Sequence, residues 1–313
     1  MCQSRALRTV PGGTLKFIRL FRLKSTLIYL FPFVLALSVG IQQTNAGTAR
    51  PVAYSWVTVL FAYLAYFCGS FFSSTLNFYA DVDADKVHDG MYKDQDISKQ
   101  PFVTGEVSKT EAAVVFAVTG GGCIAFSLLV NLRFAAFMIG AVLLLGLLYS
   151  HPWFRFKAKP VLDIVTNATG AVLILIAGMA IVSSDYPPAI PMIFGWLFSA
   201  AMYMPSVAND VPFDEAAGYR TSGVVFGQKR LVQAMLPVVA LLVPVGIWGV
   251  FSSSLNWQYR LFCLLGTGAA VLATATVWLL FNPPHIELNP DIYLVPLAGL
   301  LMVYFVVSIV GMA

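Results

Sequence analysis

Charged residues are scarce in this sequence. Asp, Glu, Lys and Arg together make up 11% of the 313 residues, whereas a typical soluble domain contains about 25%. Hydrophobic residues make up 58%, and the mean hydropathy is +0.79. A globule of 34.0 kDa with this composition lacks the polar side chains needed to cover its surface. The scarcity excludes a disordered chain, a nucleic-acid-binding module and a soluble enzyme, and it leaves a polytopic membrane protein.

Cysteine is also rare, and the four cysteines form no recognisable metal or disulfide pattern. Cys2, Cys68, Cys123 and Cys263 are far apart, and no pair has the CxxC spacing. Three of them lie in apolar stretches, where a free cysteine behaves as a small hydrophobic residue. The pattern predicts neither a zinc site nor a disulfide framework.

Long apolar runs, in contrast, fill most of the chain. A membrane-spanning helix needs about 20 apolar residues, and nine runs approach this length without the alternation of a barrel strand. We therefore predict an all-α polytopic membrane protein with nine transmembrane helices. Residues 1–24 are expected to form a basic cytoplasmic leader, and residues 25–313 a single transmembrane domain. The nine runs are 25–41, 54–80, 112–130, 132–149, 161–183, 190–208, 231–251, 261–281 and 292–312.

The first run has an alternative interpretation as a secretory signal peptide. It follows a basic stretch and precedes residues 44–47, Thr-Asn-Ala-Gly, which loosely resemble a cleavage site. The basic leader is long for such a signal, and we favour a membrane-spanning helix.

Lysine and arginine are distributed unequally between alternate loops. Under the nine-helix arrangement, one set of loops contains only Arg50, Arg133 and Arg260 of the 19 Lys and Arg residues. Positively charged residues accumulate on the cytoplasmic side of membrane proteins. The distribution predicts a cytoplasmic N-terminus and a C-terminus on the opposite side of the membrane.

Two long connections on the predicted cytoplasmic side, residues 81–110 and 209–230, hold most of the acidic residues. Where each connection begins, polar side chains recur every fourth residue, a spacing that places them on one face of a helix. Pro212 predicts a break in the second helix at this point. The residues with this spacing are Asn77, Asp81 and Asp85 at the first connection, and Asp210 and Asp214 at the second.

Carboxylates stacked on one helix face repel each other, by about a few tenths of a kcal/mol per pair at an exposed surface and by more near lipid. Bound cations between the two faces would explain the arrangement. Oxygen ligands without a nearby pair of His or Cys side chains suit Mg²⁺, which typically binds a few carboxylates together with substrate phosphates. The clusters therefore predict a magnesium site for a phosphorylated substrate. The alternative is that the carboxylates are solvated helix ends.

Basic residues are expected at the same membrane level. Residues 149–159 include Arg155 and Lys157, which are suited to neutralise the charge of a departing diphosphate. The alternative is that these residues only mark the cytoplasmic side of the membrane.

In these motifs the chain resembles the UbiA superfamily of intramembrane prenyltransferases. The two acidic clusters match the family patterns NxxxDxxxD after the second helix and DxxxD after the sixth. Residues 149–157 and 101–108 are similar to the family patterns Y-S-x-P-P-x-R-x-K and P-x-x-x-G-x-x-S. The four motifs occur in the family's order, and the resemblance covers nearly the whole chain. The linker 86–100 departs from the family, because it is longer and ends in Lys99-Gln100 where many members have an Arg next to Pro.

The resemblance implies an enzyme that ionises an allylic prenyl diphosphate with Mg²⁺. The prenyl group would pass to a hydrophobic acceptor, an aromatic compound or a lipid, with the prenyl tail lying in the bilayer-embedded part of the protein. It implies that Asn77, Asp81, Asp85, Asp210 and Asp214 hold the metal. It further implies that the diphosphate contacts Asn77, Arg155 and Lys157, together with Lys99 of the linker and Arg22 of the leader.

Other residues near the predicted site have weaker signals. The Tyr149 and Tyr79 rings are placed to face a carbocation, although both also fit an aromatic belt at the membrane interface. Asp163 and Asn167, spaced i, i+4 at the start of the fifth run, are expected to orient the acceptor.

Two alternatives from other functional classes remain at this point. One is a terpene cyclase of the same family, in which the ionised chain attacks itself and needs no acceptor. The other is a cation transporter, which the sequence disfavours because transporters place charged residues near the membrane midplane, whereas here the acids cluster at one end of the runs.

Overall fold

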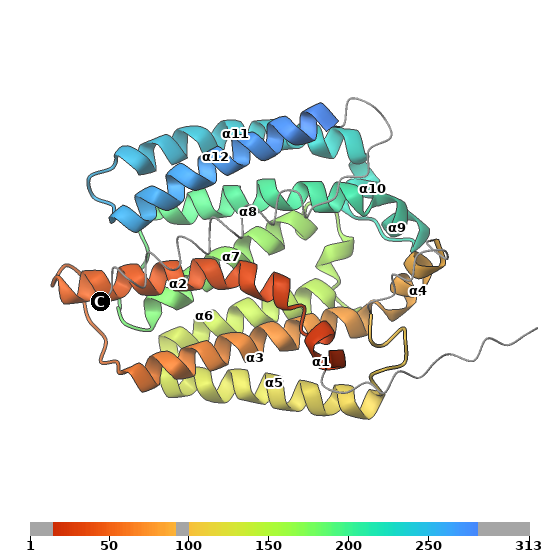
Figure 1. The fold of residues 1–313 in the computed structure, drawn as a ribbon, viewed down its shortest axis with the longest axis horizontal. Helices are drawn as coiled ribbons and strands as arrows, with labels where there is room; N and C mark the ends of the chain where they lie inside the picture. The colour runs from red at the N-terminus through yellow and green to blue at the C-terminus, as the bar shows by residue number, and fades with distance from the viewer. Residues whose placement is uncertain (1–14, 92–99, 281–313) are drawn as a thin grey trace, which may run out of the picture.

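The computed structural model describes residues 15–91 and 100–280, whose regular secondary structure is helical (Figure 1). These residues contain no β-strand, and a single isolated bridge joins Pro51 to Ser183. The prediction of an all-α protein is confirmed.

Seven of the described helices are long and apolar enough to cross a membrane, which is the architecture of an integral multi-pass membrane protein. They coincide with seven of the nine predicted runs. Their bounds are α2 (Leu23–Asn45), α3 (Trp56–Ala80), α5 (Lys109–Val130), α7 (Leu162–Ala180), α8 (Ala189–Asn209), α11 (Gln228–Phe251) and α12 (Trp257–Leu280).

The remaining two predicted runs have different outcomes. The run 132–149 forms α6 (Leu132–Val142) followed by a π-helical segment, Leu143–Leu148, and together they make a shorter apolar helix. The run 292–312 lies outside the described residues. The count of nine transmembrane helices therefore stays a prediction.

Local sequence signals explain where several helices begin. Ser55 and Ser108 each form a capping box. The serine hydroxyl accepts from the backbone N–H three residues later, and the side chain of that later residue accepts from the backbone N–H of the serine. The Asn131 side chain accepts from the Phe134 N–H at 2.7 Å and separates α5 from α6.

Two helices, α2 and α7, form the centre of the bundle. Figure 1 shows α3, α5 and α6 on one side of this pair and α8, α11 and α12 on the other. The central contact is close because Gly178 of α7 faces the backbone of Phe33 in α2, where a Cβ would lie 2.1 Å from the carbonyl oxygen. Apolar clusters on both sides include residues of α2 and α7, so the pair joins the two sides of the core.

Short helices gather at one end of the bundle. Figure 1 shows that α4 (Val82–Met91) and α9 (Val211–Ala216) lie beyond the ends of α3 and α8, with α1 (Leu15–Leu20) and α10 (Ser222–Phe226) at the same end. A 3₁₀ turn, Phe156–Ala158, precedes α7. The two acidic connections thus contain short helices, and the fold brings them to a common end.

Candidate active site

A cavity of about 830 Å³ opens among these elements, a volume within the usual range for small-molecule sites. Its wall is apolar between the helices and carries polar side chains at the end where the short helices gather. The sequence-predicted site residues that line it are Arg22, Asn77, Asp81, Asp85, Tyr149, Lys157, Asp163, Asn167, Asp210 and Asp214. Arg155 contacts one of these residues, Asp81, and Lys99 lies outside the described residues.

The first acidic segment keeps its helical register across a helix boundary. Helix α3 ends at Ala80, and Asp81 caps it by donating its N–H to the carbonyl oxygens of Asn77 and Phe78. The Asp85 N–H then donates to the Asp81 carbonyl oxygen at 2.8 Å. Because the turns before and after Asp81 are both helical, Asn77, Asp81 and Asp85 all reach the cavity wall, as their spacing predicts.

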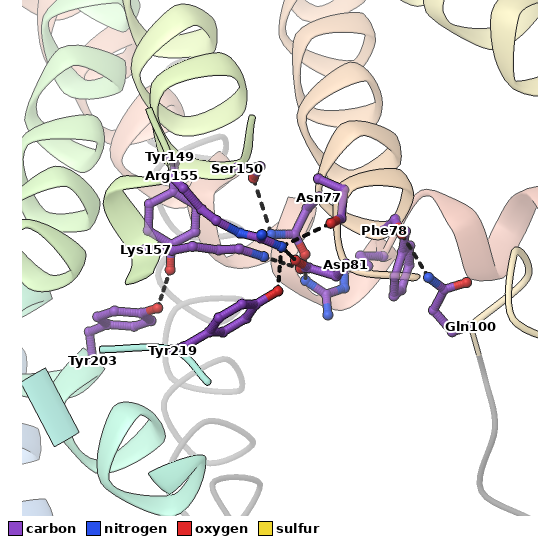
Figure 2. A network of polar contacts seen from close by, with 12 residues as sticks. Asn77, Phe78, Asp81, Gln100, Tyr149, Ser150, Arg155, Lys157, Tyr203 and Tyr219 are labelled. Carbon is purple, nitrogen blue, oxygen red and sulfur yellow. Dashed lines mark hydrogen bonds and ion pairs between the residues drawn. The ribbon is translucent and has the colours of Figure 1, made fainter. Parts of the chain in front are cut away.

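Both carboxylate oxygens of Asp81 are engaged by cations from the loop before α7 (Figure 2). The Lys157 ammonium donates to Oδ2, and Arg155 Nη2 lies 3.3 Å from Oδ1. Arg155 also donates to the Ala80 carbonyl oxygen at 3.0 Å. Burial lowers the pKa of Lys157, and the adjacent Asp81 carboxylate opposes that shift.

The second acidic segment has no such cations. Asp210 follows the last residue of α8, and the Asp214 N–H donates to its carbonyl oxygen at 2.9 Å, which gives the two residues the spacing of one helical turn. Pro212 stands at the start of α9, where a proline is tolerated. Neither Asp210 nor Asp214 forms an ion pair with another described residue.

The environment of this second segment makes its negative charge costly. Asp210 is open to the cavity, but surrounding protein removes much of its hydration, and this loss together with the Asp214 charge raises the pKa of Asp210 to about 7. Loss of hydration also raises the pKa of Asp214 to about 6. In the first acidic segment, the pKa of Asp85 is also raised, mainly by burial and to a smaller extent by the Asp81 charge. A bound cation would relieve the cost of these charges.

The carboxylates around the cavity fit Mg²⁺ if the ion binds together with a phosphorylated ligand. Within the described residues, no group of three or more His, Cys, Asp or Glu side chains is close enough to hold one metal ion. The carboxylates instead stand on two segments, α3–α4 and α8–α9, across one cavity. Because Mg²⁺ commonly takes one or two carboxylates and completes its shell with water and phosphate oxygens, the arrangement suits a metal that binds together with a phosphorylated ligand.

The leader is attached to the same end of the bundle. Lys16 forms an ion pair with Glu111 at 2.5 Å, and Arg19 forms one with Glu106 at 2.7 Å. Arg22, two residues after α1, donates to the Asn77 side chain at 2.9 Å, and its guanidinium lies 4.3 Å from the centre of the Phe78 ring. These contacts place Arg22 at the cavity wall.

Two predicted tyrosines lie in different places. The Tyr149 ring lines the cavity, and its hydroxyl contacts the hydroxyl of Tyr203 from α8 (Figure 2). Tyr79 is exposed and packs edge-on against Phe102 and Phe116, with ring centres 5.6 and 5.8 Å away. Tyr79 is not among the residues that line the cavity.

Asp163 is buried, and its oxygens are bonded within the protein. They accept hydrogen bonds from the Ser222 hydroxyl at 2.6 Å, the Ser222 N–H at 2.7 Å and the Ile164 N–H at 2.9 Å. These bonds join the start of α7 to α10. Asn167, one turn further along α7, accepts from the Ser199 hydroxyl at 3.4 Å.

Sequence reasoning missed Tyr219 and Gln100. The Tyr219 hydroxyl contacts Arg155, whose guanidinium lies 4.4 Å from the centre of the Tyr219 ring. Gln100 is buried and donates to the Phe78 carbonyl oxygen at 2.7 Å. The only sequence signals for them are their positions beside motifs, since Tyr219 follows the second acidic segment and Gln100 ends the polar linker.

Comparisons with known proteins identify relatives of the whole fold. The model of the UbiA prenyltransferase family matches residues 34–288. The structure of a UbiA homolog from Archaeoglobus fulgidus bound to GPP and Mg²⁺ has a TM-score of 0.78 and 27% identity, covering 94% of this chain and 99% of that one. The structure of that homolog bound to DMAPP and Mg²⁺ gives the same values.

A curated relative is similar over a shorter stretch. The lycopene elongase/hydratase of Haloferax volcanii is 37% identical over 92 residues, which are 29% of this chain and 30% of the relative. The chain thus matches about a third of the length of this curated relative.

Proposed function

Because the chain belongs to the UbiA prenyltransferase family, we propose that its cavity binds an isoprenyl diphosphate with Mg²⁺, ionises it and transfers the prenyl group to a hydrophobic acceptor. The observation that carries the proposal is the charge distribution around one cavity. Two acidic segments face it. Lys157 and Arg155 form ion pairs with the first, and the second forms none within the described residues. Such a site can hold both a divalent cation and the diphosphate that the cation accompanies.

The polar residues at the end of the cavity where the short helices gather have two roles in this proposal, metal binding and diphosphate binding. Asp81, Asp85, Asp210 and Asp214, with the Asn77 amide, would hold Mg²⁺, whose positive charge stabilises the diphosphate as its bond to carbon breaks. Arg155, Lys157 and Arg22 would donate to the diphosphate oxygens, on which negative charge accumulates. Lys99 is proposed for the same role from the sequence alone.

The remaining cavity wall suits an apolar chain. Phe31, Val142, Leu145, Phe198 and Phe262 line the part between the helices, so the prenyl tail would replace apolar surface there. The Tyr149 ring would face the cationic carbon. Asp163 and Asn167 are proposed to orient the acceptor, Asp163 by fixing the start of α7 against α10.

The comparisons favour a hydrophobic acceptor. The Archaeoglobus fulgidus homolog is bound to GPP and DMAPP, which are prenyl diphosphates, and the partially matching relative acts on lycopene by its name. A polyene or another apolar lipid fits a cavity whose walls are largely hydrophobic.

The proposal is tested by following both products of the reaction. Purified protein would be incubated with geranyl diphosphate, a membrane lipid extract as acceptor source and Mg²⁺, and released diphosphate and prenylated lipids would be measured. We expect both products with Mg²⁺ and neither with excess EDTA. Full turnover in EDTA would contradict the role of the metal. A cyclic hydrocarbon formed without acceptor would identify a terpene cyclase instead.

We propose that the ion pair between Lys16 and Glu111 holds the leader in place and so keeps Arg22 at the cavity wall. Lys16→Glu replaces the ion pair with Glu111 by a repulsion, and we expect it to raise the KM for the prenyl diphosphate about 5-fold, because a partly exposed pair contributes up to about 1 kcal/mol. The exchange Lys16→Glu with Glu111→Lys should restore the KM in part, because the reversed ion pair forms again while the Glu111 contact to the Ser108 N–H is lost. Lys109→Glu, which reverses an exposed charge at the start of α5, is the control. A KM unchanged in Lys16→Glu would show that the ion pair does not position Arg22.

The sidedness of the membrane protein gives another prediction. The distribution of Lys and Arg predicts that residues 209–230, the N-terminus and the connection 81–110 are cytoplasmic and that the C-terminus is on the opposite side. In a cysteine-free protein, Lys229→Cys should react with an impermeant maleimide only from the cytoplasmic side. Tyr186→Cys should react only from the other side. Both positions are exposed and therefore accessible to the reagent. Reaction of both cysteines from one side would contradict this topology.

A further inference from the structure

The ion pairs of Asp81 have a consequence for how a metal enters the site, if the proposed function holds. Lys157 and Asp81 each leave only 12% of the side chain exposed. When one partner of a buried ion pair is removed, the other is left as an uncompensated charge, which is strongly unfavourable. A metal ion that arrived alone at Asp81 would displace Lys157 and create that situation.

Arg155 is held beside Asp81 by contacts to other parts of the protein. Its Nη2 donates to the Ala80 carbonyl oxygen at 3.0 Å, its guanidinium stacks on the Tyr219 ring, and its backbone has a positive φ of 42°. Arg155 is therefore anchored beside Asp81 from α3 and from the segment after α9. The two cations together contact both carboxylate oxygens of Asp81.

A diphosphate changes this balance because its negatively charged oxygens can bind the two side-chain cations and the metal at the same time. Its oxygens can accept from Lys157 and Arg155 while others coordinate the metal. Lys157 and Arg155 then have the diphosphate as a negative partner when they leave Asp81, and the Asp81 carboxylate has the metal as a positive partner. The exchange leaves no buried charge unpaired.

We propose that Lys157 and Arg155 guard Asp81 and make metal binding at this carboxylate depend on the diphosphate. The metal then enters the site with the diphosphate and leaves with the released diphosphate, after which Lys157 returns to Asp81. The resting protein holds Mg²⁺ weakly, although four carboxylates of the two acidic segments line its cavity.

The test measures metal binding without any prenyl substrate. Mn²⁺ would be titrated into purified protein and free Mn²⁺ followed by electron paramagnetic resonance. The variant Lys157→Met removes the ammonium and keeps most of the side-chain length. We expect it to bind Mn²⁺ at least about 10-fold more tightly than the wild type, because Asp81 is freed from its strongest partner. Lys159→Met, in the same loop but exposed and placed 5.4 Å from the Phe156 ring, is the matched control and should leave the affinity unchanged.

Two further measurements complete the test. Adding Asp81→Asn to Lys157→Met should remove the gain, which shows that the freed carboxylate is the one that binds. Inorganic pyrophosphate, after correction for its own complex with Mn²⁺, should raise the metal affinity of the wild type more than that of Lys157→Met, because only in the wild type must Lys157 find a new negative partner before Asp81 can bind the metal.

The outcomes separate this inference from the proposed function. A folded Lys157→Met protein with unchanged or weaker Mn²⁺ affinity would overturn the guarding role, even if prenyl transfer occurs. Tighter Mn²⁺ binding by the variant, together with a wild type that transfers no prenyl group, would leave the guarding role intact and refute the proposed function.

Discussion

Asp81→Asn and Asp210→Asn are each expected to lower kcat for prenyl transfer by about 100-fold or more. Asparagine keeps the shape of the side chain but removes the negative charge that holds the metal, and the loss of a positioned charge in a transition-state site costs about 10²–10³-fold. The two residues lie on different acidic segments of one cavity. A large effect at both would show that the segments act together.

Asp83→Asn is the matched control for this experiment. Its side chain is 99% exposed and, among the described residues, pairs with Lys86, three residues along α4, at 3.2 Å. We expect its kcat to stay within about 2-fold of the wild type, because an exposed ion pair contributes little. Initial rates at saturating Mg²⁺ and prenyl diphosphate measure all three variants. Equal activity of Asp81→Asn and Asp83→Asn would refute a catalytic role for the first segment.

The second large effect concerns the assembly of the bundle. Gly178→Ala should strongly destabilise the protein, because the new Cβ would lie 2.1 Å from the Phe33 carbonyl oxygen and α2 and α7 would have to separate. Overpacking of this kind typically costs about 1–3 kcal/mol and sometimes more. The measurement is the fraction of protein that stays monodisperse in detergent after heating.

Gly140→Ala makes the same chemical change where nothing lies within 4 Å of the new Cβ. Alanine favours a helix over glycine by about 1 kcal/mol, so this variant should be as stable as the wild type or slightly more stable. If both variants unfold alike, the close contact between α2 and α7 does not determine the stability of the bundle.

The sequence predicted the long helices well because their signal is local. A continuous apolar run of the right length has few alternatives in a membrane protein, and the run 54–80 differs from α3 by two residues at its start. The run 132–149 is also helical, but the sequence did not predict a change of helix type within it. Its second half is π-helical where Gly146 packs closely against Ser73 of α3, and such a contact between distant residues leaves no trace in local hydropathy.

In the candidate site, too, the sequence predicted what depends on local spacing but not the contacts between distant residues. The spacing of Asn77, Asp81 and Asp85 placed them on one helix face without knowledge of the fold. Their partners were beyond prediction from spacing, because Lys157 lies 76 residues from Asp81 along the chain. Contacts at such separations depend on how the helices pack. For that reason the role of Tyr219 and the docking of the leader were visible only in the structure.

In the proposed function, a metal and a diphosphate bind between the two acidic segments. A structure of the protein with Mn²⁺ and an unreactive thio-analogue of geranyl diphosphate would locate both ligands, because anomalous scattering identifies the metal. We expect metal peaks within coordination distance of Asp81 or Asp85 and of Asp210 or Asp214, with the diphosphate between the segments and in contact with Lys157. Metal and diphosphate bound together at any other place on the protein would contradict this proposal.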